Sequence, residues 1–265
     1  MIPFFRKIRK KMADDNRPLK YMRYAIGEIV LVVIGILIAL YINNWNESRK
    51  ERKTEHLVLA EIRENLIYDL EDFEDNITHL NNKLVSSRTL LEAFEKDLPY
   101  HDSLGYYYSY LNAYPHFSSK MNGYKLLQSQ GLGIITNNEL RNQITTLYED
   151  RYQYLLTFEK ERIVYNKGPL GSAMIPYLGK SSLTPGQLPK SLSSGGNTST
   201  LRVIGFFRNI RNYDQLKKDQ DFHGMIKEIE IWSGALGTIH RSVRDNVIEL
   251  IEQIEAELGL PGDKG

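Results

Sequence analysis

An unbroken apolar run near the N-terminus constrains this chain more than any other feature. The residues from Ala25 to Ile42 are almost all Ile, Val, Leu, Gly and Ala, with one acid, Glu28. A helix rises about 1.5 Å per residue, so the run spans about 27 Å, close to the thickness of a bilayer core. It is apolar on nearly every side, whereas the helix of a soluble core usually has a polar face. The sequence therefore predicts a transmembrane helix over residues 24–42.

Residues that favour the membrane interface stand at both ends of this run. Arg23 and Tyr24 precede it, and Tyr41 and Trp45 lie at its far end. Such side chains are enriched at the interface because each combines an apolar part with a polar one. We therefore predict that these four residues are interfacial anchors. Residues 39–41 lack the small-residue pattern of a cleavage site, which disfavours a removed signal peptide.

The charges around the run predict its orientation. Residues 1–53 hold 12 Lys and Arg against 5 Asp and Glu, while residues 54–265 hold 22 against 28. Most of the N-terminal cations precede the run, and cytoplasmic flanks of membrane helices are rich in Lys and Arg. We expect a basic cytoplasmic tail over residues 1–23 and an extracytoplasmic domain over residues 43–265. A mildly acidic domain argues against a nucleic-acid partner.

Two features of the run are candidates for contact with another membrane helix. Glu28 is an acid at membrane depth, which is costly and often functional, although its side chain can also reach the interface. Gly35 and Ala39 are small residues four apart, a spacing that lets two helices approach closely. These residues favour a protein partner or a homo-oligomer within the lipid bilayer.

Beyond the run, apolar residues recur in heptads. No Gly or Pro occurs between Glu47 and Leu98, and Pro99 ends the predicted helix. The heptad spacing indicates a coiled-coil seam. Its a positions are Leu70, Ile77, Leu84, Leu91 and Leu98, and its d positions are Leu59, Leu66, Phe73, Leu80, Ser87 and Phe94.

Further amphipathic helices follow. A capping pattern at residues 136–139 starts one that runs toward Lys167 and stops at Gly168-Pro169. A short helix is predicted over residues 124–130, and a last long helix closes at Gly259. The fold class expected is all-α: one N-terminal transmembrane helix followed by an antiparallel helical bundle with a long first helix.

One segment of the domain has the composition of a connection rather than of a helix. Residues from about 168 to 200 are rich in Gly, Pro, Ser and Thr and are predicted to form a flexible loop. A short helix that docks on the bundle is expected over residues 201–210.

No motif that commits the chain to a chemistry is found. The chain has no Cys, and its six His include no pair at helical metal-ligand spacing. Lys180-Ser181 lacks the first glycine of a phosphate-binding loop. We therefore expect no catalytic residue, no metal and no cofactor, and the chain is interpreted as not being an enzyme. An unrecognised acid–base pair among the many carboxylates stays open.

A run of aromatic residues follows the first helix of the domain. It comprises Tyr106, Tyr107, Tyr108, Tyr110 and Tyr114. Aromatic side chains suit a partner surface, and they also suit the open end of a bundle that needs covering. Both interpretations are kept.

Two segments resemble a known family. Residues 4–11 (FFRKIRKK) and 24–47 (YAIGEIVLVVIGILIALYINNWNE) are similar to the opening of a bacterial family of uncharacterised single-pass membrane proteins, classed as a domain of unknown function. The helix start at residues 138–141 is similar in layout. The resemblance implies a Gram-negative envelope, with the anchor in the inner membrane and the domain in the periplasm. It implies no activity, substrate or catalytic residue.

Together these observations favour a non-catalytic scaffold or sensor that acts through protein partners in the cell envelope. The alternatives are an envelope enzyme with an unrecognised site, and a helical bundle that senses a small ligand. The two differ in what lies between the helices, either convergent acids and histidines or a ligand pocket.

Overall fold

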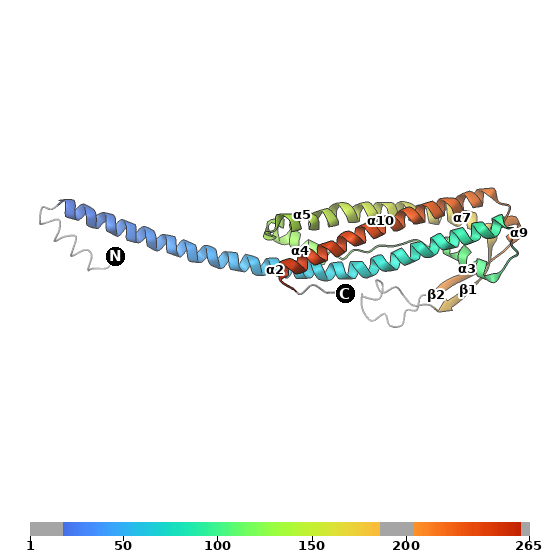
Figure 1. The fold of residues 1–265 in the computed structure, drawn as a ribbon, viewed down its shortest axis with the longest axis horizontal. Coiled ribbons are helices and arrows are strands. Elements are labelled where there is room, and N and C mark those ends of the chain that lie inside the picture. Colours follow the sequence, from blue (N-terminus) through green and yellow to red (C-terminus); the bar gives the residue numbers. More distant parts are fainter. Residues whose placement is uncertain (1–17, 186–203, 261–265) are drawn as a thin grey trace. The chain divides into compact units, whose positions relative to one another are not determined.

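The computed structural model describes residues 18–185 and 204–260, apart from the side chains of residues 18–21, 23–24, 181–185 and 204–208. The chain divides into two compact units, Met1–Thr54 and Glu55–Gly265. In chain order the elements are α2 (Pro18–Glu95), α3 (Asp102–Tyr110), α4 (Asn122–Gln130), η1 (Leu132–Ile134), α5 (Asn138–Thr146), η2 (Leu147–Arg151), α6 (Tyr152–Tyr165), η3 (Asn166–Leu170), α7 (Gly171–Met174), η4 (Ile175–Tyr177), β1 (Leu178–Pro185), β2 (Ile204–Ile210), α9 (Tyr213–Leu216) and α10 (Gln220–Leu258) (Figure 1). The all-α class is thereby confirmed.

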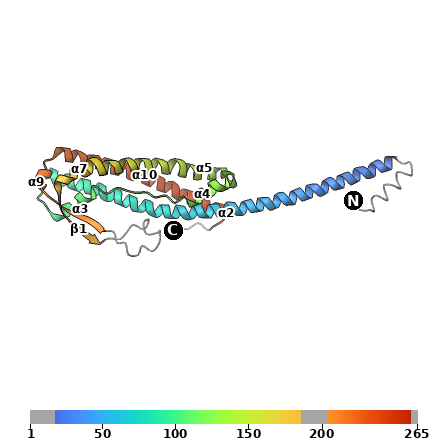
Figure 2. The ribbon, with the colours of Figure 1, turned by 180° about the vertical axis from the view of Figure 1, so that it is seen from behind.

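Three long helical rods form the second unit. They are the C-terminal part of α2, the run from α5 to α7, and α10, which lie side by side (Figures 1 and 2). Ion pairs join α2 to α10 at Arg63 with Glu255, Glu74 with Arg244, and Arg88 with Glu230. Residue numbers rise along one helix as they fall along the other, so α10 is antiparallel to α2.

The rod from α5 to α7 runs parallel to α2. Thr136 bonds to Glu55 near its start, and Tyr152 bonds to Asp69 further along, so both sets of residue numbers rise together. After α3, residues 111–121 run back along α2 without forming a helix. The next rod therefore starts beside the early part of α2 and can run parallel to it. We call residues 111–121 the strap.

The face that α2 buries differs from the predicted heptad seam. The d positions from Leu59 to Phe94 are buried as expected, but of the a positions Leu70 and Leu84 are only half-buried and Leu98 is exposed. Instead, the buried face extends from the d positions to the side of the helix that lies away from the a positions. Its additional members are Val58, Ile62, Asn65, Asp69, Asp72, Asn76, Lys83, Ser86 and Leu90. A two-stranded seam buries a and d only, whereas α2 contacts three neighbours, the strap and two rods.

Two helix ends follow the predicted glycine signals, and the capping pattern at residues 136–139 starts α5 one residue later than its Thr-to-Glu spacing predicts. Asn137 caps α5 by accepting the N–H groups of Glu139 and Leu140, and Gly131 follows α4 with φ 89°. Gly259 ends α10 with φ 68°, a left-handed conformation that glycine adopts without strain. These are local interactions, so local sequence predicts them.

Residues 166–177 correct the predicted stop at Gly168-Pro169. The helix continues through them as the π-turn η3, then α7 and η4, where a loop was expected. Pro169 has no N–H to donate, and the wider turn, in which the Gly171 N–H reaches the Asn166 carbonyl, passes the proline. Residues 186–200 of the predicted loop lie outside the described residues.

The short helix predicted over residues 201–210 is also wrong. Residues 204–210 form β2, which pairs antiparallel with β1 from Leu178 opposite Ile210 to Pro185 opposite Ile204. A two-residue alternation over so short a segment is hard to distinguish from a helical period. Pairing with β1, which is distant in sequence, decides the conformation.

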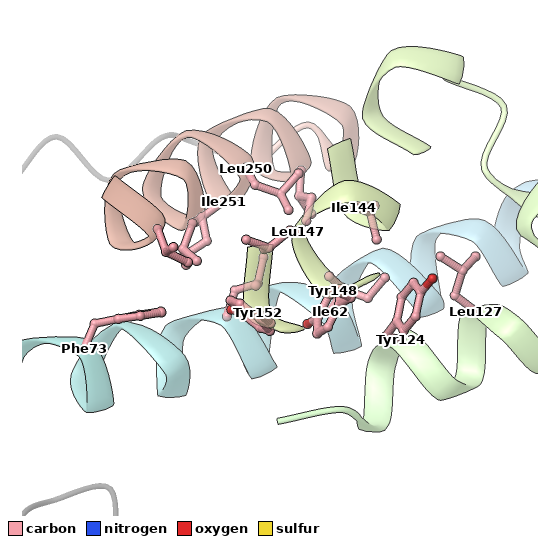
Figure 3. Packing of buried hydrophobic residues seen from close by; sticks show 14 of the residues in the cluster. Ile62, Phe73, Tyr124, Leu127, Ile144, Leu147, Tyr148, Tyr152, Leu250 and Ile251 are labelled. Atoms are coloured by element: carbon pink, nitrogen blue, oxygen red, sulfur yellow. The ribbon is translucent and has the colours of Figure 1, made fainter. Parts of the chain in front are cut away.

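The interior of the second unit consists of two apolar clusters. One contains Phe73 of α2, Tyr152 of α6 and Leu250 of α10, which point toward one another in Figure 3. The other is built around Phe94, Tyr108 and Phe222 near the far end of the rods. All members of both clusters belong to residues 58–254, so the second unit contains its own core.

Candidate functional site

A line of polar side chains runs along the buried face of α2. Asn65, Asp69, Asp72 and Asn76 are spaced by four, three and four residues, which places them on one side of the helix. None is more than 6% exposed. Polar groups so deeply buried require hydrogen-bond partners.

The partners are backbone N–H groups of the strap and the first turns of α4. His116 N–H donates to Asn76 Oδ1 at 2.9 Å, Ser118 to Asp72 Oδ2 at 2.8 Å, Lys120 to Asp69 Oδ1 at 2.8 Å, and Gly123 to Asn65 Oδ1 at 3.0 Å. An extended segment cannot satisfy its own N–H groups, and a carboxylate accepts such bonds strongly. The polar line therefore holds the strap against α2.

Asp69 also links α2 to α6. Its Oδ2 accepts a hydrogen bond from the Tyr152 hydroxyl at 2.7 Å. Burial raises the pKa of Asp69 to about 7, against the lowering effect of the hydrogen bonds from Lys120 N–H and Tyr152. A carboxyl with this pKa can exchange a proton near neutral pH, provided that water reaches it.

Glu159 and His240 connect the other face of the strap to the remaining rods. Glu159 Oε2 accepts the Phe117 N–H at 3.0 Å, and its Oε1 lies 2.9 Å from His240 Nε2 of α10. The last two atoms are close but not aligned as a hydrogen bond. Both side chains are at most 3% exposed, so this contact joins the strap, α6 and α10 in the centre of the bundle.

The carboxylates of these buried acids are all engaged by the backbone. Asp69, Asp72 and Glu159 each accept a backbone N–H, which is a structural use of the carboxylate. No described cavity is lined by any of them or by His240. Among the described residues no group of three His, Asp or Glu gathers as a metal site either.

A small cavity opens between the strap, α6 and α10, at the end of the polar line. Its walls include Lys83, Tyr114, Arg162, Asn166, Trp232 and Ser233. It has about 20 Å³ of space for solvent, enough for one water or one ion of similar size. The site is too small to enclose a metabolite.

Two cations lie at this cavity. Lys83 is 6% exposed and its Nζ donates to the Ala113 carbonyl at 2.6 Å. Burial, and after it the charge of Arg162, lowers the pKa of Lys83 to about 7. The Arg162 guanidinium stacks 4.2 Å from the Trp232 ring centre, and its Nε is buried without a hydrogen-bond partner among the described residues.

Of the five tyrosines predicted as a partner surface, Tyr108 must be removed. It is fully buried in the core and donates to the Met174 carbonyl at 2.8 Å, because α3 packs this side against the rods. Tyr106 is 49% exposed, while Tyr107, Tyr110 and Tyr114 are half-buried. Tyr110 contacts His79 through its hydroxyl, at 3.1 Å from Nδ1. One of these tyrosines therefore belongs to the core, three partly cover it, and Tyr106 is exposed.

The candidate residues of the apolar run all lie in α2. Gly35 has open space where a side chain would stand, Ala39 is exposed and Glu28 is half-buried. Of the predicted anchors, Tyr41 is 73% and Trp45 60% exposed. The side chains of Arg23 and Tyr24 lie outside the described residues.

Comparison with known proteins gives a family. Residues 28–171 match the model of a group described as Family of unknown function (DUF6090), which covers more than half of the chain. The chain belongs to this family. No curated protein and no solved structure matches it.

The DUF6090 match contains most of the polar framework. The polar line of α2, the strap, Glu159 and both cations of the cavity fall inside it, whereas Trp232 and His240 on α10 lie beyond its end. Sequence reasoning did not find the polar line. The signal is present, because Asn65, Asp69, Asp72 and Asn76 keep the spacing of the neighbouring apolar stripe, but a polar stripe on a long helix is usually solvated.

Proposed function

We propose that this DUF6090 protein is a single-pass membrane protein whose helical domain acts as a non-catalytic scaffold or sensor through protein partners. One observation carries the membrane anchor. In the most apolar 18-residue window of α2 no residue is buried, and Leu31 and Ile29 are 71% and 63% exposed. Exposure of so many Ile, Leu and Val side chains to water is strongly unfavourable, and a lipid bilayer removes that cost.

Charge supports a cytoplasmic N-terminus. The tail before the run carries eight Lys and Arg and two Asp. The positive-inside rule then places the helical domain on the opposite side of the membrane. The resemblance of residues 4–11 and 24–47 to bacterial single-pass proteins supports the Gram-negative inner membrane, with the domain in the periplasm.

The use of buried polar groups supports a non-catalytic role. The carboxylates that sequence alone left open as an acid–base pair are bonded to backbone N–H groups and enclosed in the core. A tail of about 23 residues is short for an output domain, so signalling would pass through a partner that contacts Glu28 or the face of Gly35 and Ala39.

The anchor and its orientation are tested by fractionation and topology reporters. The full-length protein is expected in the membrane pellet after alkaline carbonate washing. A periplasm-active phosphatase fused after residue 265 should be active, and the same enzyme fused before residue 1 inactive. Recovery of the full chain in the soluble fraction without detergent would reject the anchor, and the reverse reporter pattern would reject the orientation.

The partner proposal is tested by photo-crosslinking in native membranes. A photoreactive residue in place of Glu28 or Tyr106 is expected to give specific adducts larger than the monomer. The same residue in place of exposed Lys160 on α6 is the matched control and should give fewer. If every position yields only monomer, the scaffold proposal is wrong, and a soluble-ligand or catalytic role takes its place.

A further inference from the structure

The cavity between the strap, α6 and α10 contains an excess of positive charge. Lys83 and Arg162 both line it, and neither forms an ion pair with a described carboxylate. The lining includes one acid, Glu228, which is exposed and accepts a hydrogen bond from Trp232 Nε1 at 2.9 Å. Lys83 is buried and Arg162 is half-buried. A buried cation without a partner of opposite charge is costly, so Lys83 beside a second cation favours a counter-ion.

The hydrogen-bond donors of these two cations are largely unused. A lysine ammonium has three N–H donors, and one protein acceptor, the Ala113 carbonyl, is present for Lys83. That carbonyl also accepts from Asn166 Nδ2 at 3.3 Å, so it is shared. Arg162 has five donors and no described acceptor, and its Nε is buried. The donors around the cavity therefore exceed the acceptors.

We propose that this cavity binds one small monovalent anion of halide size between Lys83 and Arg162. The lysine comes from α2 and the arginine from α6, and the cavity also contacts the strap and α10, so the ion joins four segments of the bundle. The space of about 20 Å³ is of the size that a single halide ion needs. The site is independent of the proposed protein partner and of the membrane anchor.

Two properties of the surroundings favour an anion over a water molecule. Apolar and aromatic residues, among them Leu80, Ile229 and Trp232, form much of the wall, and a low dielectric strengthens the attraction between an anion and two cations. Burial also lowers the pKa of Lys83 to about 7. A bound anion would restore the charged form of Lys83, so binding is expected to be tighter below pH 7 than above it.

The test uses Trp232 as a reporter in the full-length, detergent-solubilised protein. The chain has two tryptophans, so Trp45→Phe leaves Trp232 as the only one, beside the guanidinium of Arg162. Sodium bromide is titrated against sodium gluconate at constant ionic strength. We expect a saturable loss of Trp232 fluorescence with bromide, and a rise in Tm of roughly 2 to 5 °C in chloride relative to gluconate.

Lys83→Met and Lys160→Met form the matched pair of variants. Both remove one lysine charge, but Lys160 is exposed on the outside of α6. Lys83→Met is expected to abolish the saturable quenching and the chloride-dependent rise in Tm, and to raise Tm in gluconate, because it removes a buried cation. Lys160→Met should behave as the parent.

Three results would overturn the proposal. Quenching that increases only linearly with bromide would mean collision at an exposed ring. Equal Tm values in chloride and gluconate for the parent protein would mean that water alone occupies the cavity, and this measurement requires no variant to fold. An undiminished chloride effect in Lys83→Met would place the anion elsewhere.

Discussion

Asp69 shows how one residue can carry both structure and pH sensitivity. Its two oxygens accept separate hydrogen bonds, from Lys120 N–H and from the Tyr152 hydroxyl. The negative charge of the neighbouring Asp72 raises the pKa of Asp69 further, while the positive charge of Lys120 lowers it. Burial therefore disfavours the ionised form of Asp69 although both of its oxygens accept a hydrogen bond.

Substitution Asp69→Asn is expected to flatten the pH dependence of stability. Asp69 has a pKa of about 7 in the folded protein, against about 3.9 in the unfolded chain. Between about pH 4 and 7, Asp69 is protonated in the folded state and ionised in the unfolded chain. Raising the pH removes that proton, so the free energy of unfolding falls across this range. Asn keeps an acceptor for the Lys120 N–H and cannot titrate. Urea unfolding at several pH values measures the change.

The control for Asp69 is Glu252→Gln on the exposed face of α10. This substitution should leave the slope of unfolding free energy against pH, between pH 4 and 7, as it is in the parent. An unchanged slope in Asp69→Asn would mean that this carboxyl is ionised in the fold throughout that range.

Glu159 supports a second prediction at the residue scale. Glu159→Ala leaves the buried Phe117 N–H without its acceptor and is expected to cost about 1 to 3 kcal/mol of unfolding free energy. Glu159→Gln keeps a carbonyl oxygen at the same reach and should cost less. Chemical unfolding monitored by circular dichroism gives both values. Equal losses in the two variants would show that the contact of the carboxylate with His240, which both variants remove, dominates instead.

Among the elements, the strap shows which features depend on local sequence and which depend on distant segments. Local sequence predicts the end of α10 at Gly259, because that end depends on a few neighbouring residues. The strap was not predicted, because its conformation depends on acceptors contributed by α2, some 40 to 58 residues earlier in the chain. The same reason applies to β2, whose partner strand β1 is distant in sequence.

The junction of the strap and α4 depends on a glycine. A Cβ at Gly123 would lie 2.6 Å from the Ile62 backbone nitrogen and 2.8 Å from its Cα, which belong to α2. Gly123→Ala is therefore expected to separate α4 from α2 and to lower the unfolding free energy by about 1 to 3 kcal/mol. Thermal unfolding of the full chain measures the effect.

Gly224→Ala is the matched control for this prediction. Gly224 lies in α10 with no heavy atom near its Cβ position, so alanine there should stabilise the helix by about 0.5 to 1 kcal/mol. If both substitutions change the unfolding free energy in the same direction, the close approach of α4 to α2 at Gly123 does not limit the packing.

At the scale of the whole molecule, the two units have different requirements for solvent. The core clusters lie entirely within residues 58–254, whereas the apolar window of α2 in the first unit has no buried residue. The helical domain should therefore fold without the run, while the run should not remain in water. The domain start at residue 43 stays a prediction. The second compact unit begins at Glu55, and the residues between the run and that position are mostly exposed.

A polypeptide of residues 55–265 is expected to be soluble, helical and cooperatively folded. Its buried polar line and both core clusters are intact, so its unfolding midpoint in urea should lie close to that of the same region in the full chain. Circular dichroism and sedimentation measure helicity and association. Aggregation, or unfolding without a cooperative transition, would show that residues 1–54 contribute to the fold.

Composition, period and contacts between near neighbours predict the apolar run, the all-α class and the glycine ends of α4 and α10. Packing between distant segments sets the parallel direction of α2 and the α5–α7 rod, the burial of Tyr108, and the shared cavity of Lys83 and Arg162. Those features arise where segments far apart in the chain exchange hydrogen bonds and exclude water. No local pattern encodes which distant backbone N–H will meet a given carboxylate.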